Sequence, residues 1–568
     1  MSLHHPIELT KAQESRAAIE RVYIEMRHLF NSGIYKPSGA SGQQLTDSLL
    51  TLRPEIYGSM NDPSKVELDG LVYVIERLPK GIEECRFIRL ISEEGYHKSG
   101  FEVLIPHARK RNCYRIDDEQ MFIEVTRGRS EIYDILTHLT FMYHEAEKIK
   151  EHAYDGGGNL RKEWLALEKL VISEQDLKGK SKELAFTYLS TLLGRTYEET
   201  KAAVMRLQSS KSNNNGLFHI VYWLGTLIIR EKQENKTIEI SFSPTLRQRI
   251  GHHMYGERWS QQINKYLIKA KLLDRPIHVI SANLHSFLNT LYCFAALKES
   301  ERKKQSLEGV ALMLSDPKNK ELNDLVEAFA AKNGLHLIKD SNGTNISVQV
   351  IDTAKINFDL LPAEIKADQA KTWSKKPVLI VFDYAFGEQA YEIMDELLKP
   401  LEENDQISIR VASINIMGKA GILQGGKGDI MIPTAHVFEG TADNYPIVND
   451  FKASDFHAKG LYVCEGPMIT VLGTSLQNKE VLEYFESSSW NAIGLEMEGA
   501  HYQKAIQSHA IIRNSISKDV VLRYAYYASD NPLVTGNTLA SGSLGLVGVK
   551  PTYLITTAII NKIFQQQE

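Results

Sequence analysis

Cysteine is scarce in this sequence, and the few cysteines are far apart. The 568 residues include four, Cys85, Cys113, Cys293 and Cys464, and no two of them form a Cys-x-x-Cys pair. Disulfide frameworks and structural zinc sites both rely on paired or closely spaced cysteines. The spacing therefore argues against both kinds of site and is typical of a protein from a reducing compartment.

Long apolar runs and blocks of one charge are also missing. The net charge is −5 without a long single-sign block, so we expect no dedicated nucleic-acid surface, although a local basic pocket for a phosphate remains possible. The N-terminal stretch MSLHHPIELTKAQESR has no apolar signal region. Polar residues interrupt the apolar runs well before the ~20 residues that span a bilayer. We therefore expect a cytoplasmic protein without a membrane partner.

The length favours more than one domain, and the texture of the sequence changes near Asp274-Arg275-Pro276. The first half predicts a mostly helical α+β domain over 1–270, with helices over 10–31 and 131–153. "GLVYVIERLP" and "CRFIRLIS" predict two strands of a hairpin, to which "QMFIEVTRG" adds a third. "RQRIGHHMYGER", just before the boundary, is interpreted as a linker in preference to a phosphate contact.

The second half, 271–568, predicts an α/β domain. Short β-rich runs alternate with helical stretches, and several runs are continuously apolar, which is typical of strands buried on both faces of a sheet. "PTYLITTAIINKIFQ" predicts a C-terminal helix that begins near a proline.

Polar groups gather where several of these strands end, and ligands of open α/β sheets bind at carboxyl ends of strands. Each group also has a structural interpretation, as a turn, a loop or a solvated strand end. The candidates are Phe386-Gly387-Glu388, a glycine-dense turn with Gly418, Lys419 and Gly421, the pair Glu496 and Glu498 around Met497, and Ser529-Asp530.

The order of these motifs resembles a known family. "GKAGIL" followed by "GDIMIP", then "GLEMEGA", then a strand ending in "SDNPL", is similar to the nucleoside phosphorylase/nucleosidase superfamily, and most similar to its AMP nucleosidases. The resemblance covers residues 276–568 and implies a three-layer αβα domain with a mixed sheet. It also implies a purine nucleoside or nucleotide substrate, no cofactor or metal, and a homo-oligomer.

The resemblance assigns roles to the residues of these motifs. Asp530, after Ser529, corresponds to the acid that protonates the base, and this role needs an apolar site that raises the pKa of a carboxyl. Glu498 corresponds to the residue that binds the ribose hydroxyls, and its carboxylate favours positive charge on the sugar. Met497 would pack against the ribose, and Glu496 would support the site.

Two phosphate anchors of the phosphorolytic relatives are absent from the matching positions. The first strand leads into "ISANLHSFLN" instead of a GD-x-x-R turn, and Ile416 replaces an arginine before Met417-Gly418. Hydrolysis is therefore favoured over phosphorolysis. Lys419 is still a candidate for a phosphate, as cosubstrate or as part of a nucleotide. Weaker candidates are Asn283 and His285 after the first strand, Glu388 to orient water, and Phe438 or Tyr462 to stack on the base.

Other interpretations stay open. "SHAIIRNSISKD" lengthens the stretch between Glu498 and Asp530 relative to the family, which puts the match of Asp530 at risk. A phosphorylase with a differently built phosphate site is one alternative, and a nucleotide-binding sensor without chemistry is another. In the first half, His138, His144 and Glu145 do not form HExxH, and we interpret them as a helix surface instead of a metal site.

Overall fold

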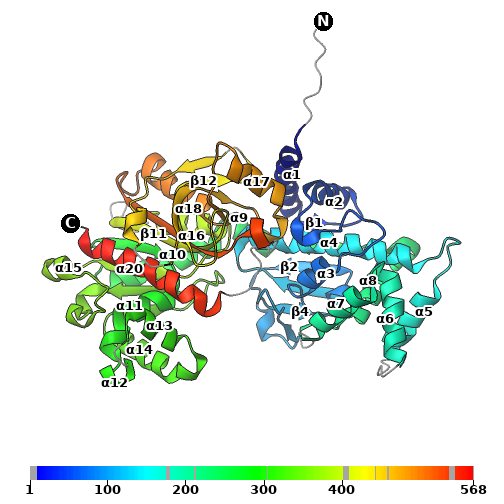
Figure 1. Ribbon diagram of the computed structural model, residues 1–568, viewed down its shortest axis with the longest axis horizontal. Helices are drawn as coiled ribbons and strands as arrows, with labels where there is room; N and C mark the ends of the chain where they lie inside the picture. Colours follow the sequence, from blue (N-terminus) through cyan, green and yellow to red (C-terminus); the bar gives the residue numbers. More distant parts are fainter. Residues whose placement is uncertain are drawn as a thin grey trace, which may run out of the picture. The chain divides into compact units, whose positions relative to one another are not determined.

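The computed structural model describes residues 9–173, 180–209, 213–302, 305–400, 409–441, 443–456, 460–535 and 544–566 (Figure 1). The chain divides into two compact units. Unit 1 comprises Met1–His252 and Ser475–Val481, and unit 2 comprises His253–Thr474 and Leu482–Glu568. Helix α10 (Met254–Lys269) therefore belongs to unit 2, whereas the sequence-based boundary at 270 assigns it to the N-terminal part.

Unit 1 contains a six-stranded sheet surrounded by helices. The strand order is β1-β6-β2-β5-β4-β3, and β2 runs parallel to both β5 and β6. The strands are β1 (Ile34–Tyr35), β2 (Phe87–Ile91), β3 (Val103–Leu104), β4 (Cys113–Arg115), β5 (Gln120–Glu124) and β6 (Glu239–Phe242). The α-helices are α1 (Lys11–Ser32), α2 (Ala40–Leu52), α3 (Leu68–Ile75), α4 (Gly128–Ala153), α5 (Lys162–Ile172), α6 (Lys180–Leu193), α7 (Tyr197–Ser209), α8 (Leu217–Glu234) and α9 (Pro244–Gly251).

The predicted hairpin is wrong, because "GLVYVIERLP" lies in helix α3 and its following turn. The Glu67 side chain accepts hydrogen bonds from the backbone N–H groups of Asp69 and Gly70, and so caps the helix. Nearly every residue of α3 is buried, so its sequence shows no helical periodicity. The other two segments form β2 and β5, which pair in parallel instead of as a hairpin.

Two further predictions for this half are wrong. His138 and Glu145 lie on α4, but both are fully buried and do not form a helix surface. The His138 ring packs beside Tyr57, whose hydroxyl lies 3.2 Å from Nδ1. The segment interpreted as a linker is helical, because α9 ends at Gly251 and α10 begins at Met254.

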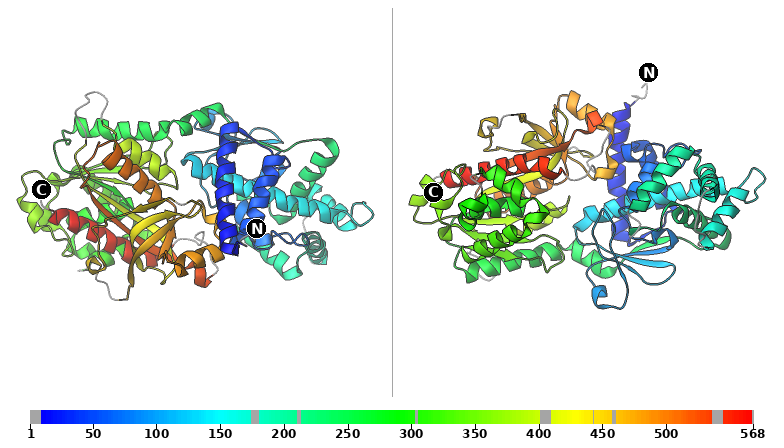
Figure 2. Two further views of the ribbon diagram at one scale, coloured as in Figure 1. Left: turned by 90° about the horizontal axis from the view of Figure 1, so that it is seen from above. Right: turned by 60° about the horizontal axis from the view of Figure 1, so that its bottom comes forward.

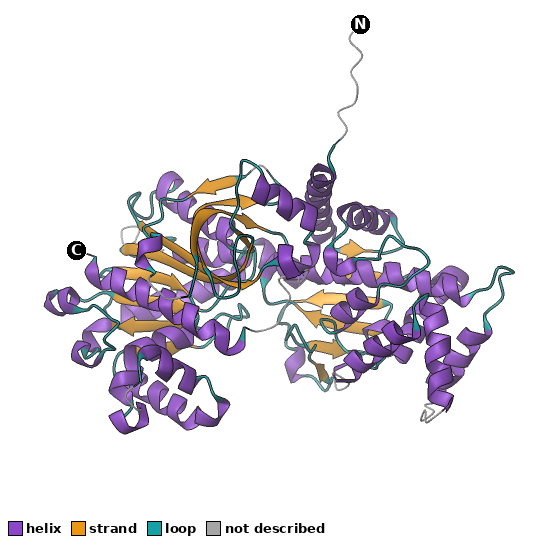
Figure 3. Ribbon diagram, viewed as in Figure 1, coloured by secondary structure: helices purple, strands orange, loops and turns teal. Residues whose placement is uncertain are grey.

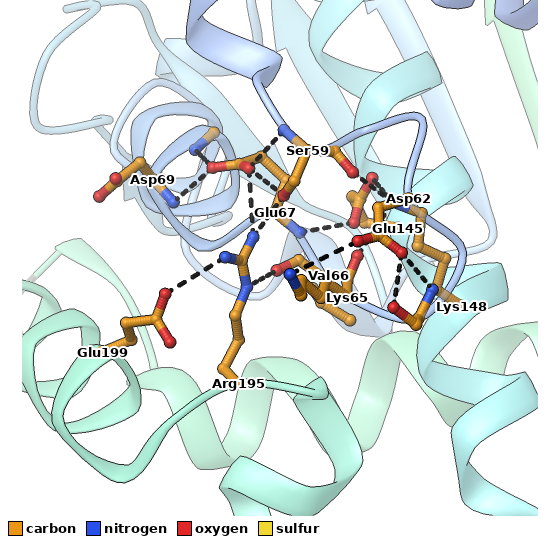
Figure 4. Close-up of polar contacts among 12 residues, drawn as sticks. Ser59, Asp62, Lys65, Val66, Glu67, Asp69, Glu145, Lys148, Arg195 and Glu199 are labelled. Carbon is orange, nitrogen blue, oxygen red and sulfur yellow. Dashed lines mark hydrogen bonds and ion pairs between the residues drawn. The ribbon is translucent and has the colours of Figure 1, made fainter.

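A buried polar network ties α4 to the loop before α3 and to the turn between α6 and α7 (Figure 4). Arg195 donates to the Val66 carbonyl (2.7 Å) and to Glu67 (3.2 Å). Glu145 accepts the backbone N–H of Glu67 (2.8 Å) and lies 2.9 Å from Lys148. Burial raises the pKa of Glu145 to about 7, although Lys148 opposes this shift.

Unit 2 is built on one mixed sheet of ten strands (Figure 3). The path is β13-β12-β14-β15-β11-β7-β10-β9-β8, and β16 pairs with both β11 and β12. The strands β11, β16, β12, β14 and β15 therefore pair in a closed ring. The strands are β7 (Ile277–Ser281), β8 (Leu335–Ile338), β9 (Val348–Asp352), β10 (Val378–Phe382), β11 (Val411–Ile422), β12 (Ile430–Phe438), β13 (Asn444–Pro446), β14 (Val463–Thr470), β15 (Gly494–Glu496) and β16 (Val521–Asp530).

Helices cover both faces of this sheet, which gives the three-layer αβα arrangement predicted for the second half. One apolar core joins the sheet to α10, α16 and α18, and a second core joins its other face to α11, α13, α14 and α20. The C-terminal helix α20, red in Figure 2, packs against α11 and α13. The helices after α10 are α11 (Leu284–Ala296), α12 (Glu299–Arg302), α13 (Leu307–Leu314), α14 (Lys320–Lys332), α15 (Asp368–Thr372), α16 (Gln389–Leu397), α17 (Lys479–Ser487), α18 (Gly499–Gln507), α19 (Pro532–Thr535) and α20 (Val549–Gln565).

Among the described residues, no helix has both the length and the apolar character needed to cross a membrane.

Candidate active site

A small cavity of about 190 Å³ lies in unit 2, where β7, β10, β11 and β16 approach the same edge of the sheet. These four strands run parallel. The carboxyl ends of β7 and β10 reach the cavity, whereas β11 and β16 continue past it to Ile422 and Asp530. The polar side chains of its wall are Ser281, Tyr384, Lys419, Glu498, Tyr502 and Tyr526. The described residues of the wall thus combine one carboxyl group, one ammonium group and several hydroxyls.

Among the described residues, Glu498 is the only one that brings a carboxyl group to the wall of this small cavity. It occupies the N-cap position of α18, and its Oε1 accepts the backbone N–H of Gly387 at 2.9 Å. Gly387 has φ of +56°, a conformation that favours glycine. Burial and the neighbouring charge of Glu496 raise the pKa of Glu498 to about 8. The ligand-free carboxyl is therefore mainly protonated at neutral pH.

Glu496 lines neither this cavity nor the larger one described below. It accepts hydrogen bonds from the Thr470 hydroxyl and from the backbone N–H groups of Glu498 and Gly499. Burial opposes its charge, but His436, whose Nδ1 lies 3.3 Å away, and these hydrogen bonds lower its pKa. Glu496 therefore holds the start of α18, and with it the backbone of Glu498. Met497 is also buried and lines neither cavity.

Asp530 ends β16 next to Gly421 of β11, and Leu495 of β15 pairs with the same glycine from the other side. The Ser529 hydroxyl contacts Asp530 Oδ1, whereas Oδ2 is buried without a hydrogen-bond partner among the described residues. Burial raises the pKa of Asp530, against the effects of Ser529 and Lys419. Asp530 is 1% exposed and lines neither cavity. Its carboxyl is thus buried, with one free oxygen, beside the edge that holds Glu498.

The glycine-dense segment differs from the predicted turn. Gly418, Lys419 and Gly421 lie within strand β11, and the turn is confined to the residues after Ile422. A Cβ at Gly418 would lie 2.6 Å from the Tyr526 ring, so glycine is needed there for packing. In the turn itself, the Gly426 N–H donates to Asp429 at 2.8 Å. The Gly426 N–H is therefore already bonded to a carboxylate of the protein itself.

A larger cavity of about 900 Å³ shares Lys419 with the small one. Asn283 and His285, at the start of α11, line it, as do residues at the starts of α14 and α20. Asn283 caps α11, because its Oδ1 accepts the Ser286 N–H at 3.2 Å. Burial lowers the pKa of Lys419, Asp530 opposes this shift, and Lys427 adds to it. Lys419 is therefore the residue that links the two cavities.

Glu388 and Phe438 are not brought to either cavity. Glu388 is the N-cap residue of α16, and its charge acts on His501. Phe438 packs edge-to-face against His501 with ring centroids 4.9 Å apart. Tyr462 is 53% exposed and also lies outside both walls. The interpretation of the aromatics as packing residues fits Phe438 better than stacking on a base.

Three tyrosines of the small cavity were not among the predicted site residues. The Tyr502 hydroxyl lies 3.1 Å from Ser281 Oγ. The Tyr384 and Tyr526 hydroxyls are buried, and neither has a hydrogen bond within the part of the chain that the structure describes. The sequence does contain a signal for Tyr502, which follows Glu498 by four positions and so lies on the same helix face. Tyr384 belongs to a loop after β10, and its spacing from other residues in the sequence does not predict that it lies at the cavity.

Comparisons with known proteins give one family and a set of distant structures. A family model described as a family of unknown function (DUF6909) matches residues 43–304 and 310–565. No curated protein matches the chain.

The solved structures that resemble the chain cover about half of it. Futalosine hydrolase of Helicobacter pylori strain 26695 is 12% identical, with a TM-score of 0.28 over 51% of this chain and 97% of that one. The Streptococcus pneumoniae MTA/SAH nucleosidase in complex with 8-aminoadenine is 10% identical, with a TM-score of 0.30 over 50% and 99%. The Schistosoma mansoni uridine phosphorylase in complex with thymine is 13% identical, with a TM-score of 0.30 over 52% and 89%. At TM-scores this low, the likeness says nothing about the activity of this chain.

Proposed function

We propose that this chain, which belongs to the family of unknown function DUF6909, hydrolyses the N-glycosidic bond of a purine nucleoside or nucleotide. The observation that carries the proposal is the placement of two acids around Gly421. Leu495, in the strand that leads to Glu498, pairs with this glycine on one side, and Asp530 pairs with it on the other. Cleavage of this bond needs an acid for the leaving base and a group that favours positive charge on the sugar.

Glu498 is the proposed sugar-binding group. A cavity of about 190 Å³ is smaller than most pockets for whole ligands and is suited to a fragment such as a pentose. The Gly387 N–H orients one carboxyl oxygen, and the Met497 N–H, 3.3 Å from Oε2, orients the other. Two ribose hydroxyls that donate to this carboxyl would stabilise its ionised form. The carboxylate would then also stabilise the positive charge that develops on the sugar.

Asp530 is the proposed general acid. A carboxyl group must keep its proton near neutral pH to serve in this role, and burial shifts the pKa of Asp530 in that direction. Its Oδ2 has no competing partner among the described residues. Proton transfer requires the base to lie within about 2.6–3.2 Å of Oδ2. This oxygen is buried in the ligand-free protein, so the substrate has to gain access to it on binding.

Asp316, Asp324 and Glu327 line the large cavity near α14, whereas the part that adjoins the small cavity favours an anionic group beside the sugar. The N-termini of α11 and α20 open on it, and helix N-termini attract negative charge. Lys419, which borders both cavities, adds a positive charge. This arrangement suits the 5′-phosphate of a nucleotide. It also suits a phosphate cosubstrate, which makes phosphorolysis the second candidate reaction.

The test is to incubate the full chain with AMP, adenosine or methylthioadenosine, with and without inorganic phosphate, and to measure free base. Base release in phosphate-free buffer, with ribose or ribose 5-phosphate as the second product, is the expected result. Release only with phosphate, together with a ribose 1-phosphate product, would identify a phosphorylase. No release from any of the three would instead support a ligand-binding sensor.

A further inference from the structure

A third cavity of unit 2, of about 270 Å³, lies at the end of the sheet opposite the small cavity. Its wall includes Pro276 and Pro377, which precede β7 and β10, and Val411 and Val520, at the starts of β11 and β16. The amino ends of four parallel strands therefore border this cavity, which we call the amino-end cavity. Among the described residues, it shares none with the walls of the other two cavities.

His278 of β7 brings a buried polar side chain to the wall of the amino-end cavity. It is 3% exposed, and Ile280, on the same face of the strand, belongs to an apolar core. An aliphatic residue would suit this position better, because the nitrogens of a buried imidazole need hydrogen-bond partners. The hydrogen bonds of His278 therefore decide what this part of the wall offers to a ligand.

A chain of hydrogen bonds fixes which nitrogen of His278 carries the proton. Arg523 Nη1 donates to Asn415 Oδ1 at 3.2 Å, so Asn415 Nδ2 is the atom that donates to Ser413 Oγ, at 2.9 Å. The buried Ser413 hydroxyl has one remaining neighbour among the described residues, His278 Nδ1 at 2.7 Å, and donates its own proton to it. Burial and Arg523 lower the pKa of His278 to about 3, so the ring is neutral at pH 7. A neutral ring that accepts at Nδ1 carries its proton on Nε2.

This Nε2–H group has no acceptor within the part of the chain that the structure describes. A buried donor without an acceptor is costly, and the ring of His278 already lines a cavity. An oxygen atom of a ligand in the cavity would supply the acceptor. His278 therefore indicates a ligand that presents an oxygen to the inner wall.

The rim of the amino-end cavity carries one positive and one negative side chain. Arg410 and Asp519 are both exposed, and neither forms an ion pair with the other or with another described residue. A guanidinium group binds a carboxylate with two N–H groups, and a carboxylate accepts from an ammonium group. The half-buried ring of Trp373 adds an apolar surface to the same wall. These groups match a small molecule that has a carboxylate, an ammonium group and an apolar part.

We propose that the amino-end cavity binds a free α-amino acid with an apolar side chain. The carboxylate of the amino acid accepts from His278 Nε2 and from Arg410, and its ammonium group donates to Asp519. Its side chain packs against Trp373. A volume of about 270 Å³ suits so small a ligand, because pockets for drug-sized molecules start at roughly 300 Å³. The site does not depend on the function proposed for the other two cavities.

The experiment is isothermal titration of the full chain with L-phenylalanine and L-leucine. Each amino acid is compared with an acid that lacks the ammonium group, 3-phenylpropionate or 4-methylpentanoate. Each is also compared with an amine that lacks the carboxylate, phenethylamine or 3-methylbutylamine. At least one of the two amino acids is expected to bind saturably. Its two analogues should bind at least about tenfold more weakly, as for loss of a charged hydrogen bond.

Variants at the rim test the two charges separately. Arg410→Gln should weaken binding of the amino acid at least about tenfold. Asp519→Asn should weaken binding of the amino acid but not of the acid that lacks the ammonium group, a difference that a merely structural effect would not produce. Lys518→Gln is the matched control, because Lys518 is exposed beside Asp519 and does not line the cavity. It should bind the amino acid as the parent does.

His278→Leu removes the inner donor and should weaken binding of the amino acid as well. Thermal unfolding without amino acid checks the fold of this variant, and the exposed rim positions keep the test valid if it does not fold. Absence of saturable binding for both amino acids would overturn the proposal. Equal affinities of Arg410→Gln and Lys518→Gln, or an acid analogue that binds as tightly as its amino acid, would overturn it too.

Discussion

The backbone N–H of Gly387 donates to Glu498 Oε1 at 2.9 Å, and this contact orients a carboxyl group on the wall of the small cavity. Burial and Glu496 raise the pKa of Glu498 to about 8. At lower pH the carboxyl group has to lose its proton before the ligand hydroxyls can donate to the carboxylate. We expect the affinity for a cleavable nucleoside to rise with pH up to about 8 and then level off. The rise should be at most about tenfold per pH unit.

This pH dependence is best measured as binding in the Asp530→Asn background, in which turnover does not interfere. Glu498→Gln in the same background should bind about 10- to 100-fold more weakly above pH 8, as for loss of charged hydrogen bonds. Its affinity should also be independent of pH. An unchanged rise with pH in Glu498→Gln would assign the titration to another group.

Asp530→Asn should lower turnover by about 10²- to 10⁴-fold, the usual contribution of a general acid, with little change in the dissociation constant of the nucleoside. The asparagine has nearly the same shape but no proton to give at neutral pH. Single-turnover base release and equilibrium binding are the two measurements.

Ser529→Ala is the companion variant. Because the Ser529 hydroxyl lowers the pKa of Asp530, its removal should shift the alkaline limb of the rate profile to higher pH. A normal rate in Asp530→Asn would remove Asp530 from the acid role.

The sequence predicted the α/β half better than the first half, for a physical reason. Strands such as β10 are buried on both faces, so a short apolar run identifies them. Helix α3 is also buried almost throughout, and an apolar run of this kind does not distinguish helix from strand. The cap at Glu67 decides for the helix, but its hydrogen bonds are formed only in the folded chain.

The candidate site was predictable where residues are adjacent in sequence and unpredictable where strand pairing brings them together. The resemblance assigned Glu496 a supporting role and Glu498 the ribose hydroxyls. In the structure Glu498 lines the small cavity and Glu496 does not, and the two roles stay predictions. Tyr384 reaches the cavity wall from the loop after β10 and Tyr526 reaches it from β16, and only the pairing of β10, β7, β11 and β16 brings them together. Lys419 was expected in a turn because glycines flank it, but β11 continues through these glycines as part of the sheet.

Lys419→Gln should discriminate between nucleotides and nucleosides. If Lys419 binds a 5′-phosphate between the two cavities, its loss should raise the KM for AMP by about tenfold or more and leave the KM for adenosine nearly unchanged. Steady-state kinetics with both substrates measures this difference. Lys427→Gln, in the adjoining turn, is the matched control because Lys427 lines neither cavity. Equal effects on AMP and adenosine would show that Lys419 does not act on the phosphate.

Gly418→Ala should disturb the small cavity directly. The new Cβ would lie 2.6 Å from the Tyr526 ring, which is packed on β16 and lines the cavity. We expect a loss of about 1–3 kcal/mol in the free energy of unfolding, typical of overpacking, together with weaker nucleoside binding. Chemical denaturation and titration measure the two effects. Gly473→Ala is the control, because a Cβ there meets no atom within 4 Å. Equal stability of the two variants would contradict the packing role of Gly418.

Glu145 makes the stability of the protein depend on pH. Its pKa is about 7 in the folded chain, against an ordinary value of 4.5, so its ionisation disfavours the folded state. The stability that its protonated form contributes is complete below pH 4.5 and is lost as the pH rises through 7. This loss is at most about 3 kcal/mol.

In Glu145→Gln, which retains an acceptor for the Glu67 N–H, the unfolding temperature should decrease less between pH 5 and 8 than in the parent. Glu147→Gln, at an exposed position of the same helix, should follow the parent at every pH. Parallel curves for the parent and Glu145→Gln would mean that Glu145 is already ionised at pH 5.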